Sequence, residues 1–593
     1  MERFASKQRG GYPEMGTETM PVSTSSKLAQ VWFDRGLVWI FGFNHTEAIK
    51  CDGPLGNRVH KIDFNEFILH ISNPLNLRYA SGHNYNFPVL FDYDKAYKHT
   101  VAAKQLAEQK GVSVVYKRFL LAMEITELEK GLIDSLQLRY EENMLNPEEK
   151  PKEAAAQIAR LQVDYASSMR AVYKKFGENP HVAAFFAEQL MNRKPWELWV
   201  PDQKTGVVYL PTNNKLSYIH CMELSPTPEV ALDAADALAA VRVPGSGHLT
   251  HMATHIDMWV GNYERAVKVN AISVEQDKRY VEKTGHNDGF YAVYRAHNLH
   301  FQMWAACFDG QYEVALNCAK DMGEMLPEEI MNQFPGYLEW FCVHIPMVYI
   351  RFGKWNEILQ EPFPKDPVTW PAMTAVLRYS RGIAFAALGK VEEAEKEQKL
   401  FHEALARTEL HRKYGLNNLV YDTSEKKRGN LNVAEKMLEG EILYRKGEYD
   451  KAFQALKEAV TLDDSLIYDE PWGWSQPARH ALGALLAEQK HYEEAISVFK
   501  EDLKRWPENL WALCGLLTCA KGNGDVKETE MLKTRLAKAS SRATISVDAA
   551  CFCANRLDGE VLLMKNKKTA PGEVAGCCRH DKSALEKAEK EEN

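Results

Sequence analysis

The sequence lacks long apolar runs, an excess of either charge, and a dense set of cysteines. No uninterrupted apolar stretch approaches the ~18 residues that a membrane-spanning helix needs, and the start has no apolar stretch of the kind that marks a secretory signal. Lys and Arg number 73 against 81 Asp and Glu, a net charge of −8, which argues against phosphate-backbone binding. Eleven Cys in 593 residues do not suggest a disulfide framework. We therefore expect a cytoplasmic protein with reduced thiols and with neither a membrane nor a nucleic-acid partner.

Motifs for nucleotide binding and for serine hydrolysis are missing as well. The sequence contains no P-loop, no GxGxxG and no GxSxG, so it gives no support to those two classes of enzyme. Most segments between the two ends place apolar residues at i, i+3, i+4 and i+7, the spacing of amphipathic helices. The sequence therefore predicts an all-α protein.

A short motif recurs where predicted helices end: a Gly, an aromatic residue two positions later, then acidic residues and an Ala. Gly permits a tight turn between two antiparallel helices, the aromatic side chain fills the gap between them, and the small Ala lets them approach. The successive Gly spacings are 49, 43, 36 and 58 residues, so the repeats are degenerate. The copies begin at Gly261, Gly310, Gly353, Gly389 and Gly447, with variants at Lys490 and Phe43.

This motif resembles that of the tetratricopeptide repeat (TPR) family, whose period is about 34 residues. The resemblance implies a TPR-like α-solenoid, a right-handed superhelix of antiparallel helix pairs. We predict four regions along the chain. They are a disordered N-terminal lead (1–26), an irregular N-terminal helical region (27–240), degenerate TPR-like repeats (241–540) and a C-terminal extension (541–593) that is partly disordered.

Seven of the 19 His lie between 220 and 300, and several of them share a helical register. His248, His251 and His255 fall within roughly a 60° arc of one helix, which Ser246 is placed to cap. Imidazoles at i,i+3 or i,i+4 can share a metal ion, but seven residues span about 10 Å of helix. Three arrangements therefore stay open: one His supports the site without binding the metal, the stripe serves two ions, or His248 lies on the turn.

Two further pairs have i,i+3 spacing: His297 with His300, and His220 with Glu223. Because consecutive helices of a solenoid pack side by side, helices near 215–225, 248–260 and 291–305 are expected to face one another. Neutral imidazole binds Zn, Cu, Fe and Ni, and a set so rich in His favours copper over zinc or iron. The ordinary alternative is a polar groove, or His packing on Trp259 and Tyr294.

The wording around these residues resembles a family of bacterial and fungal TPR proteins with a His-rich pattern. The resemblance covers about 32–555 and rests on Tyr218–Glu229, on the PGSGHLTHMATHI run from Pro244, on HNLHF ending at Phe301, and on Arg351–Leu359. It implies the solenoid fold and a metal site, and it does not imply a reaction. The family's pattern maps onto His220, Glu223, His248, His251, His255, His297 and His300.

These observations favour a metal-dependent oxidoreductase, most simply a copper enzyme acting on a small-molecule substrate with dioxygen. The six His would be ligands, and Glu223 an acid/base or supporting group. A TPR adaptor that binds a protein partner in its groove is the second hypothesis, and a zinc hydrolase with Glu223 as general base is the third. Residues 51–82 show no helical stripe, and Cys551, Cys553 and the 577–580 run lack zinc-ribbon spacing. No function is assigned to these segments, and His83 is at most a peripheral neighbour of the site.

Overall fold

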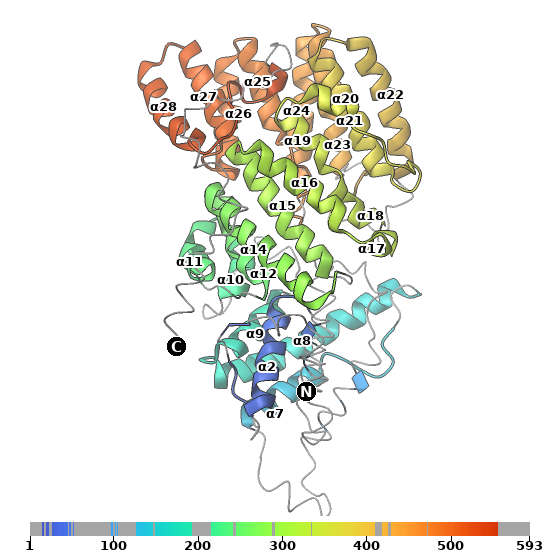
Figure 1. Ribbon diagram of the computed structural model, residues 1–593, viewed down its shortest axis with the longest axis vertical. Helices are drawn as coiled ribbons and strands as arrows, with labels where there is room; N and C mark the ends of the chain where they lie inside the picture. Colours follow the sequence, from blue (N-terminus) through green and yellow to red (C-terminus); the bar gives the residue numbers. More distant parts are fainter. Residues whose placement is uncertain are drawn as a thin grey trace, which may run out of the picture.

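The chain is all-α in the computed structural model (Figure 1). The structure describes residues 27–44, 126–145, 149–191, 215–240, 245–287, 291–333, 335–408, 418–424, 429–470 and 472–554, together with 243 and isolated positions between 15 and 104. Over these residues it confirms the predicted TPR-like α-solenoid of antiparallel helix pairs. None of the helices that can be described is both long and apolar enough to cross a bilayer. The segment 56–82, His83 and the 577–580 run lie outside the described residues.

The helices before the regular repeats fall into two groups at one end of the molecule (Figure 1). The first group comprises α2 (Lys27–Phe41), α7 (Glu127–Gln137), α8 (Pro151–Phe176) and α9 (Pro180–Met191). The second comprises α10 (Lys215–Glu223), the 3₁₀ helix η2 (Pro228–Ala231), α11 (Leu232–Ala240), α12 (Gly247–His251) and α13 (Ala253–Val260).

The remaining helices form the repeat array. Its first half comprises α14 (Tyr263–Thr284), α15 (Tyr291–Asp309), α16 (Tyr312–Met325), α17 (Glu328–Gln333), α18 (Pro335–Leu338), η3 (Glu339–Cys342), α19 (His344–Arg351) and α20 (Trp355–Gln360). Its second half comprises α21 (Pro371–Ala387), α22 (Val391–Thr408), α23 (Asn430–Arg445), α24 (Tyr449–Ser465), α25 (Ala478–Glu488), α26 (Tyr492–Arg505), α27 (Leu510–Gly522), α28 (Val526–Ser540) and η5 (Phe552–Ala554).

The recurring Gly motif forms the turns between paired helices, as predicted. Gly261, Gly310, Gly353, Gly389 and Gly447 all have φ between 64° and 80°, the left-handed region that Gly adopts without steric cost. The variant positions Lys490 and Phe43 take up the same conformation, with φ of 64° and 57°. The Ala (Ile in one copy) five residues beyond each turn is fully buried. These residues are Ala48, Ala266, Ala315, Ile358, Ala394, Ala452 and Ala495.

The described part of the N-terminal lead differs from the expectation of disorder. Met20 is 1% exposed, and its backbone N–H donates to Asp34 of α2. The Gln30 side chain donates to the Met20 carbonyl and to Asp34. These hydrogen bonds hold an apolar side chain of the lead in the core of the N-terminal helices, an interaction for which periodicity gives no signal. The start of the C-terminal extension is likewise packed, because Arg542 pairs with Asp309 at the end of α15.

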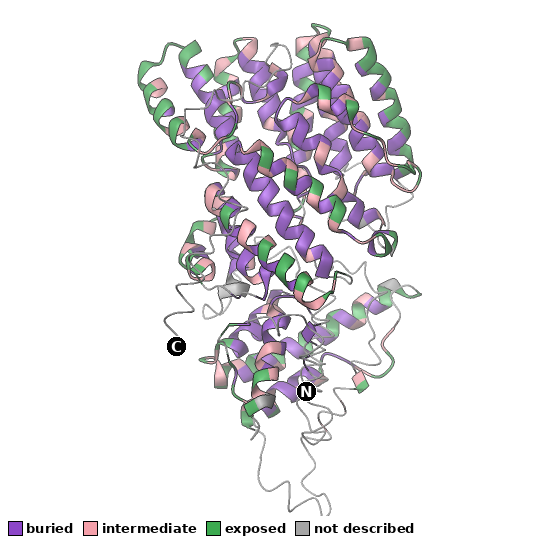
Figure 2. Ribbon diagram, in the orientation of Figure 1, coloured by how far each residue is buried: buried purple, intermediate pink, exposed green. Residues whose placement is uncertain are grey.

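α15 runs through the middle of the molecule and is buried along nearly its whole length (Figure 2). One apolar core links it to the repeats, a second joins the N-terminal helices to the start of α15, and a third lies between α10, η2, α11 and α13. The segment from His248 to His255 lies where the three cores meet. The polar residues of this segment are therefore enclosed by apolar packing on several sides.

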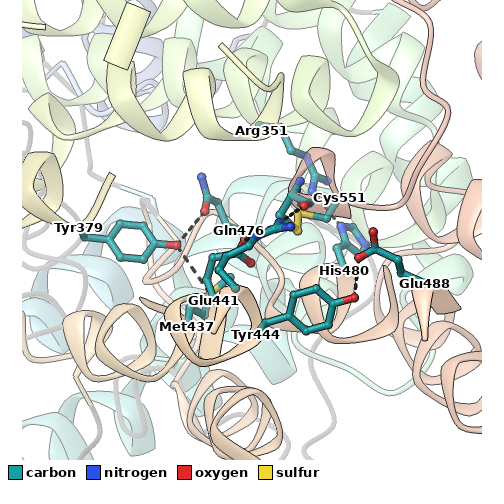
Figure 3. Close-up of a disulfide and its surroundings, with 11 residues drawn as sticks. Arg351, Tyr379, Met437, Glu441, Tyr444, Gln476, His480, Glu488 and Cys551 are labelled. Atoms are coloured by element: carbon teal, nitrogen blue, oxygen red, sulfur yellow. Dashed lines mark hydrogen bonds and ion pairs between the residues drawn. A yellow bond between two sulfur atoms is a disulfide. The ribbon is translucent and has the colours of Figure 1, made fainter. Parts of the chain in front are cut away.

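One disulfide occurs among the described residues, between Cys551 and Cys553 (Figure 3). It joins residues two positions apart, so it cross-links no pair of helices. It lies beside a cavity of about 40 Å³ whose lining includes Arg351, Tyr379 and His480. The other seven described Cys are free thiols, consistent with the expectation that no disulfide framework supports the fold.

Candidate metal centre

The predicted His residues come together from three separate helical segments. α12 and α13 form one segment, broken at Met252, whose N–H still bonds to the His248 carbonyl. This segment packs against α10 through α13 and against α15 through α12. The predicted juxtaposition of the three helices is therefore present. Because the helix breaks between His251 and His255, the stripe need not follow a regular helix.

Three imidazole nitrogens converge at the centre of this group. His251 Nε2 lies 2.9 Å from His255 Nε2 and 2.9 Å from His297 Nε2. Two nitrogens bound to one metal at about 2.0 Å stand about 2.8 Å apart at a right angle and about 3.3 Å apart at the tetrahedral angle. The three rings are buried, with His251 and His255 completely enclosed. Their spacing is that of ligands to a single ion.

Neighbouring side chains fix which nitrogen of each ring carries the hydrogen. Asn270 on α14 uses its amide group to donate to Thr254 Oγ1 and to the Ala266 carbonyl, so its Oδ1 faces His251 Nδ1 at 2.7 Å as an acceptor. His251 Nδ1 therefore donates, and its Nε2 presents a lone pair. His255 Nδ1 likewise donates to Glu223 Oε2 at 2.6 Å. Partners of this kind orient metal-ligating His in known sites.

Two lone pairs 2.9 Å apart in a buried place repel each other unless a cation lies between them. The cation is either a proton on one ring or a metal ion bound by both. Burial alone would lower the pKa of His255, but the carboxylates of Glu223 and Glu470 outweigh it and raise this pKa. Burial, reinforced by His255, lowers the pKa values of His251 and His297 well below the ordinary His value. Neutral imidazoles are the form that binds metals.

A carboxylate group adjoins the three nitrogens. His220, Glu223, His255 and Glu470 each offer one ligand atom within 4.8 Å of the others. Glu223 bridges two rings, with Oε1 2.7 Å from His220 Nδ1 and Oε2 bound to His255. Burial raises the pKa of Glu223, but His255 and His220 more than compensate and lower it to about 2. Glu223 is thus a permanent anion that orients two imidazoles.

Glu470 and Tyr468 add a proton-carrying unit. The Tyr468 hydroxyl lies 2.7 Å from Glu223 Oε2 and 2.6 Å from Glu470 Oε1. One hydroxyl hydrogen cannot serve both oxygens. Burial, with the Glu223 charge nearby, raises the pKa of Glu470, so a protonated Glu470 can donate to the Tyr468 oxygen while Tyr468 donates to Glu223. Glu470 Oε2 is also 3.8 Å from His297 Nε2.

His248 lies at the other edge of the cluster. It forms a second three-residue group with His251 and His297, and its ring stacks on that of His251 at a centroid distance of 5.2 Å. Its Nδ1 is 3.4 Å from Asn298 Oδ1. It sits in the first turn of α12, where Ser246 occupies the N-cap position but makes no capping hydrogen bond with its side chain. His248 is thus a neighbour of the three central nitrogens.

His300 is not brought to this cluster. It lies one turn of α15 beyond His297, on another side of the helix, and its ring centroid is 4.9 Å from that of His344. The i,i+3 spacing predicts that His297 and His300 share a face, but a helix advances about 300° over three residues. Here the 60° offset carries His300 past Phe301 and into an aromatic layer.

Sequence reasoning missed Asn270, Tyr468, Glu470 and Phe301. Asn270 and Phe301 lie on helices of the predicted set, but nothing in their spacing separates them from ordinary core residues. Tyr468 and Glu470 belong to the segment after α24, about 245 residues from Glu223. The run Tyr-Asp-Glu-Pro at 468–471, between two helices, is a polar stretch that interrupts the repeat pattern, and it is the one available signal.

Comparisons with known proteins leave the assignment to this geometry. No protein-family model and no curated protein matches the sequence. Among solved structures, the human IFIT1 dimer with m7Gppp-AAAA is 10% identical, with 87% of this chain and 91% of that chain covered and a TM-score of 0.27. Yeast Tom70 is 12% identical, with 86% and 99% covered and a TM-score of 0.24. Likenesses this distant do not bear on function.

Proposed function

We propose that this chain is a helical-repeat metalloprotein whose transition-metal ion is bound by His251, His255 and His297. The convergence of their Nε2 atoms, with two of the three rings oriented so that lone pairs face each other, is the observation that carries the proposal. A hydrogen-bonded core His needs one partner of opposite polarity, and here the partner of each inward nitrogen is another imidazole.

The carboxylates and the tyrosine define what the protein itself does at this centre. Glu223 and Asn270 hold two ligands in the metal-binding tautomer. Glu470 carries a proton within reach of His297, and Tyr468 connects that proton to Glu223. His220 and Glu470 are the partly exposed members of the group, with 17% and 15% of their side chains accessible, so we infer that a substrate approaches from their side.

A metal ion at this position would supply Lewis acidity and, if it is copper, one-electron redox chemistry. The three imidazoles suit copper, in line with the oxidoreductase that uses dioxygen and a small-molecule substrate, and they suit zinc equally. The two neighbouring carboxylates, which the sequence did not predict beyond Glu223, widen the choice towards zinc and iron. With Glu470 in place of Glu223 as the proton-transfer group, a zinc hydrolase is equally compatible with the donor set.

Metal analysis of the purified protein tests the proposal. We expect close to one equivalent of a single transition metal by ICP-MS after metal-replete growth, and its loss in His251→Ala and His255→Ala. An EPR signal with nitrogen hyperfine structure identifies copper(II), whereas zinc(II) is silent. His402→Ala, which removes a half-exposed ring on α22, is the matched control and should retain the metal. A metal-free wild type under these conditions contradicts the proposal.

A protein-binding scaffold is the second candidate, and the architecture taken alone favours it over any named reaction. Solenoids of helix pairs present extended surfaces on which partners dock. In that case the metal holds the helical segments together and takes part in no reaction. A single dominant partner recovered in pull-downs, still bound by His251→Ala and in the presence of chelator, would support the scaffold and leave the centre a structural role.

A further inference from the structure

His300 and His344 form a second buried pair of imidazoles, about one helical turn from the proposed metal centre. His300 belongs to α15 and His344 begins α19. They are 0% and 1% exposed, and their ring centroids are 4.9 Å apart. None of their four ring nitrogens has a hydrogen-bond partner. A neutral His always has one N–H donor and one acceptor, and leaving a buried polar group unpaired costs about 1–3 kcal/mol.

The surroundings of this pair are aromatic and uncharged. Trp304 stacks on His300 at 6.4 Å, Trp472 lies 6.1 Å away and Phe341 meets it edge-on. Burial lowers the pKa of His344 to about 3, and no charged side chain among the described residues counters this effect. Both rings are therefore neutral, and each presents a lone pair in a place without carboxylates.

We propose that His300 and His344 bind a soft monovalent metal ion, copper(I), between two of their ring nitrogens. Imidazole–metal bonds of about 2 Å each place two opposed nitrogens about 4 Å apart, a separation that rings with centroids 4.9 Å apart can provide. The ion would satisfy one lone pair on each ring, which no protein group does. The inference does not depend on the proposed centre at His251, His255 and His297.

The charge of the surroundings selects the ion. A divalent cation transferred into a neutral, enclosed site without an anionic ligand pays a large desolvation penalty. A monovalent ion pays much less, and the faces of Trp304 and Trp472 stabilise a cation through their ring quadrupoles. Copper(I) accepts two ligands and binds imidazole, whereas zinc(II) in structural sites requires four.

Anaerobic titration with copper(I) against a chromogenic copper(I) chelator tests the pair. Wild type is expected to hold one equivalent more than His344→Phe, a substitution that keeps a flat ring and removes both nitrogens. His251→Ala should retain that equivalent, which separates this site from the proposed centre. His402→Ala serves as the control for a ring outside both sites. An X-ray absorption edge typical of two-coordinate copper(I) is expected from the His251→Ala protein.

Equal copper(I) uptake by wild type and His344→Phe overturns the proposal, as does uptake of zinc(II) in place of copper(I) at the pair. His300→Phe removes the other ring and provides a second variant should His344→Phe not fold. A wild-type crystal soaked with silver(I) gives a reading that needs no variant. An anomalous peak between the two rings supports the site, and its absence contradicts it.

Discussion

Asn270 controls the proposed metal centre without reaching it. Its amide donates to Thr254 Oγ1 and the Ala266 carbonyl, which leaves only its oxygen for His251 Nδ1. The hydrogen of His251 is thereby placed on Nδ1, and the lone pair on Nε2 is directed at His255 and His297. A neutral amide achieves for His251 what the charged Glu223 achieves for His255.

Substitution of Asn270 should therefore weaken metal binding without removing a ligand. We expect Asn270→Ala to lower metal affinity by about 10–100-fold, measured by competition with a chelator of known affinity. Asn270→Asp keeps the acceptor oxygen and should restore most of the affinity. If both variants bind metal as wild type does, the ring of His251 is oriented by packing alone and the role assigned to Asn270 is wrong.

Glu339 makes stability depend on alkaline pH. Its buried carboxyl accepts the Met373 N–H at 2.7 Å, and burial raises its pKa from 4.5 to about 8. Below pH 4.5 the carboxyl is protonated in both the folded and the unfolded chain. Between pH 4.5 and 8 only the unfolded chain loses the proton, so stability falls as pH rises, with a slope of up to about 1.4 kcal/mol per pH unit.

Glu339→Gln removes this term, because the amide cannot ionise. We expect the urea midpoint of the variant to fall less between pH 5 and pH 8 than that of wild type. Glu357→Gln, on the more exposed α20, should follow the wild-type profile. Parallel profiles for wild type and Glu339→Gln would mean that Glu339 is already ionised in the folded protein.

At the scale of helices, the turn between paired helices is the element that the sequence encodes most directly. A positive φ explains why Gly recurs there, and contacts differ from turn to turn. A methyl group at Gly389 would meet nothing within 4 Å, whereas at Gly310 it would lie 2.8 Å from both Ala543 Cβ and Leu510 Cδ2. The first position isolates backbone strain, and the second adds a clash.

Gly389→Ala should therefore cost about 1 kcal/mol, and Gly310→Ala distinctly more. Lys490→Gly should gain about 1 kcal/mol, because Lys490 already holds the strained conformation with φ 64°. Hydrogen exchange of the flanking helices measures these local free energies. An equal loss in the two Ala variants would show that the chain around Gly310 moves aside without cost.

At the scale of the whole molecule, the fold follows from the sequence better than the site does. Helix pairs were predictable because Gly261 and its counterparts mark local turns, and local turns need no knowledge of distant segments. The convergence of His251, His255 and His297 was predictable as far as side-by-side packing of successive helices determines it. His300 diverges because a 60° offset on α15 decides which layer a side chain enters.

Glu470 and Tyr468 could not be predicted at all from local pattern. Their positions depend on how the array returns past α10, a property of the summed rotations of many helix pairs. Degenerate spacing between repeats makes that sum unreadable from the chain. The packed Met20 escaped prediction for a related reason, because its partner, α2, is visible only as a separate helix.

The centre joins segments that the chain otherwise connects only through packing, so metal binding should stabilise the whole fold. A ligand at 1,000 times its Kd adds about 4.1 kcal/mol, and we expect the apparent Tm to fall when a chelator strips the wild type. His251→Ala should show a low Tm that the chelator leaves unchanged. A chelator effect of equal size in both proteins would place the stabilising ion elsewhere.

Glu223 and Tyr468 lie 245 residues apart, and a ribosome adds about 5–20 residues per second. For about 12–50 s of synthesis the nascent chain therefore carries the bridging carboxylate and its imidazoles without the tyrosine that later closes over them. Metal supplied during that interval meets a half-built, open pocket, whereas metal supplied after release must enter a finished one. Loading of this protein is thus a question of timing in translation as much as of affinity.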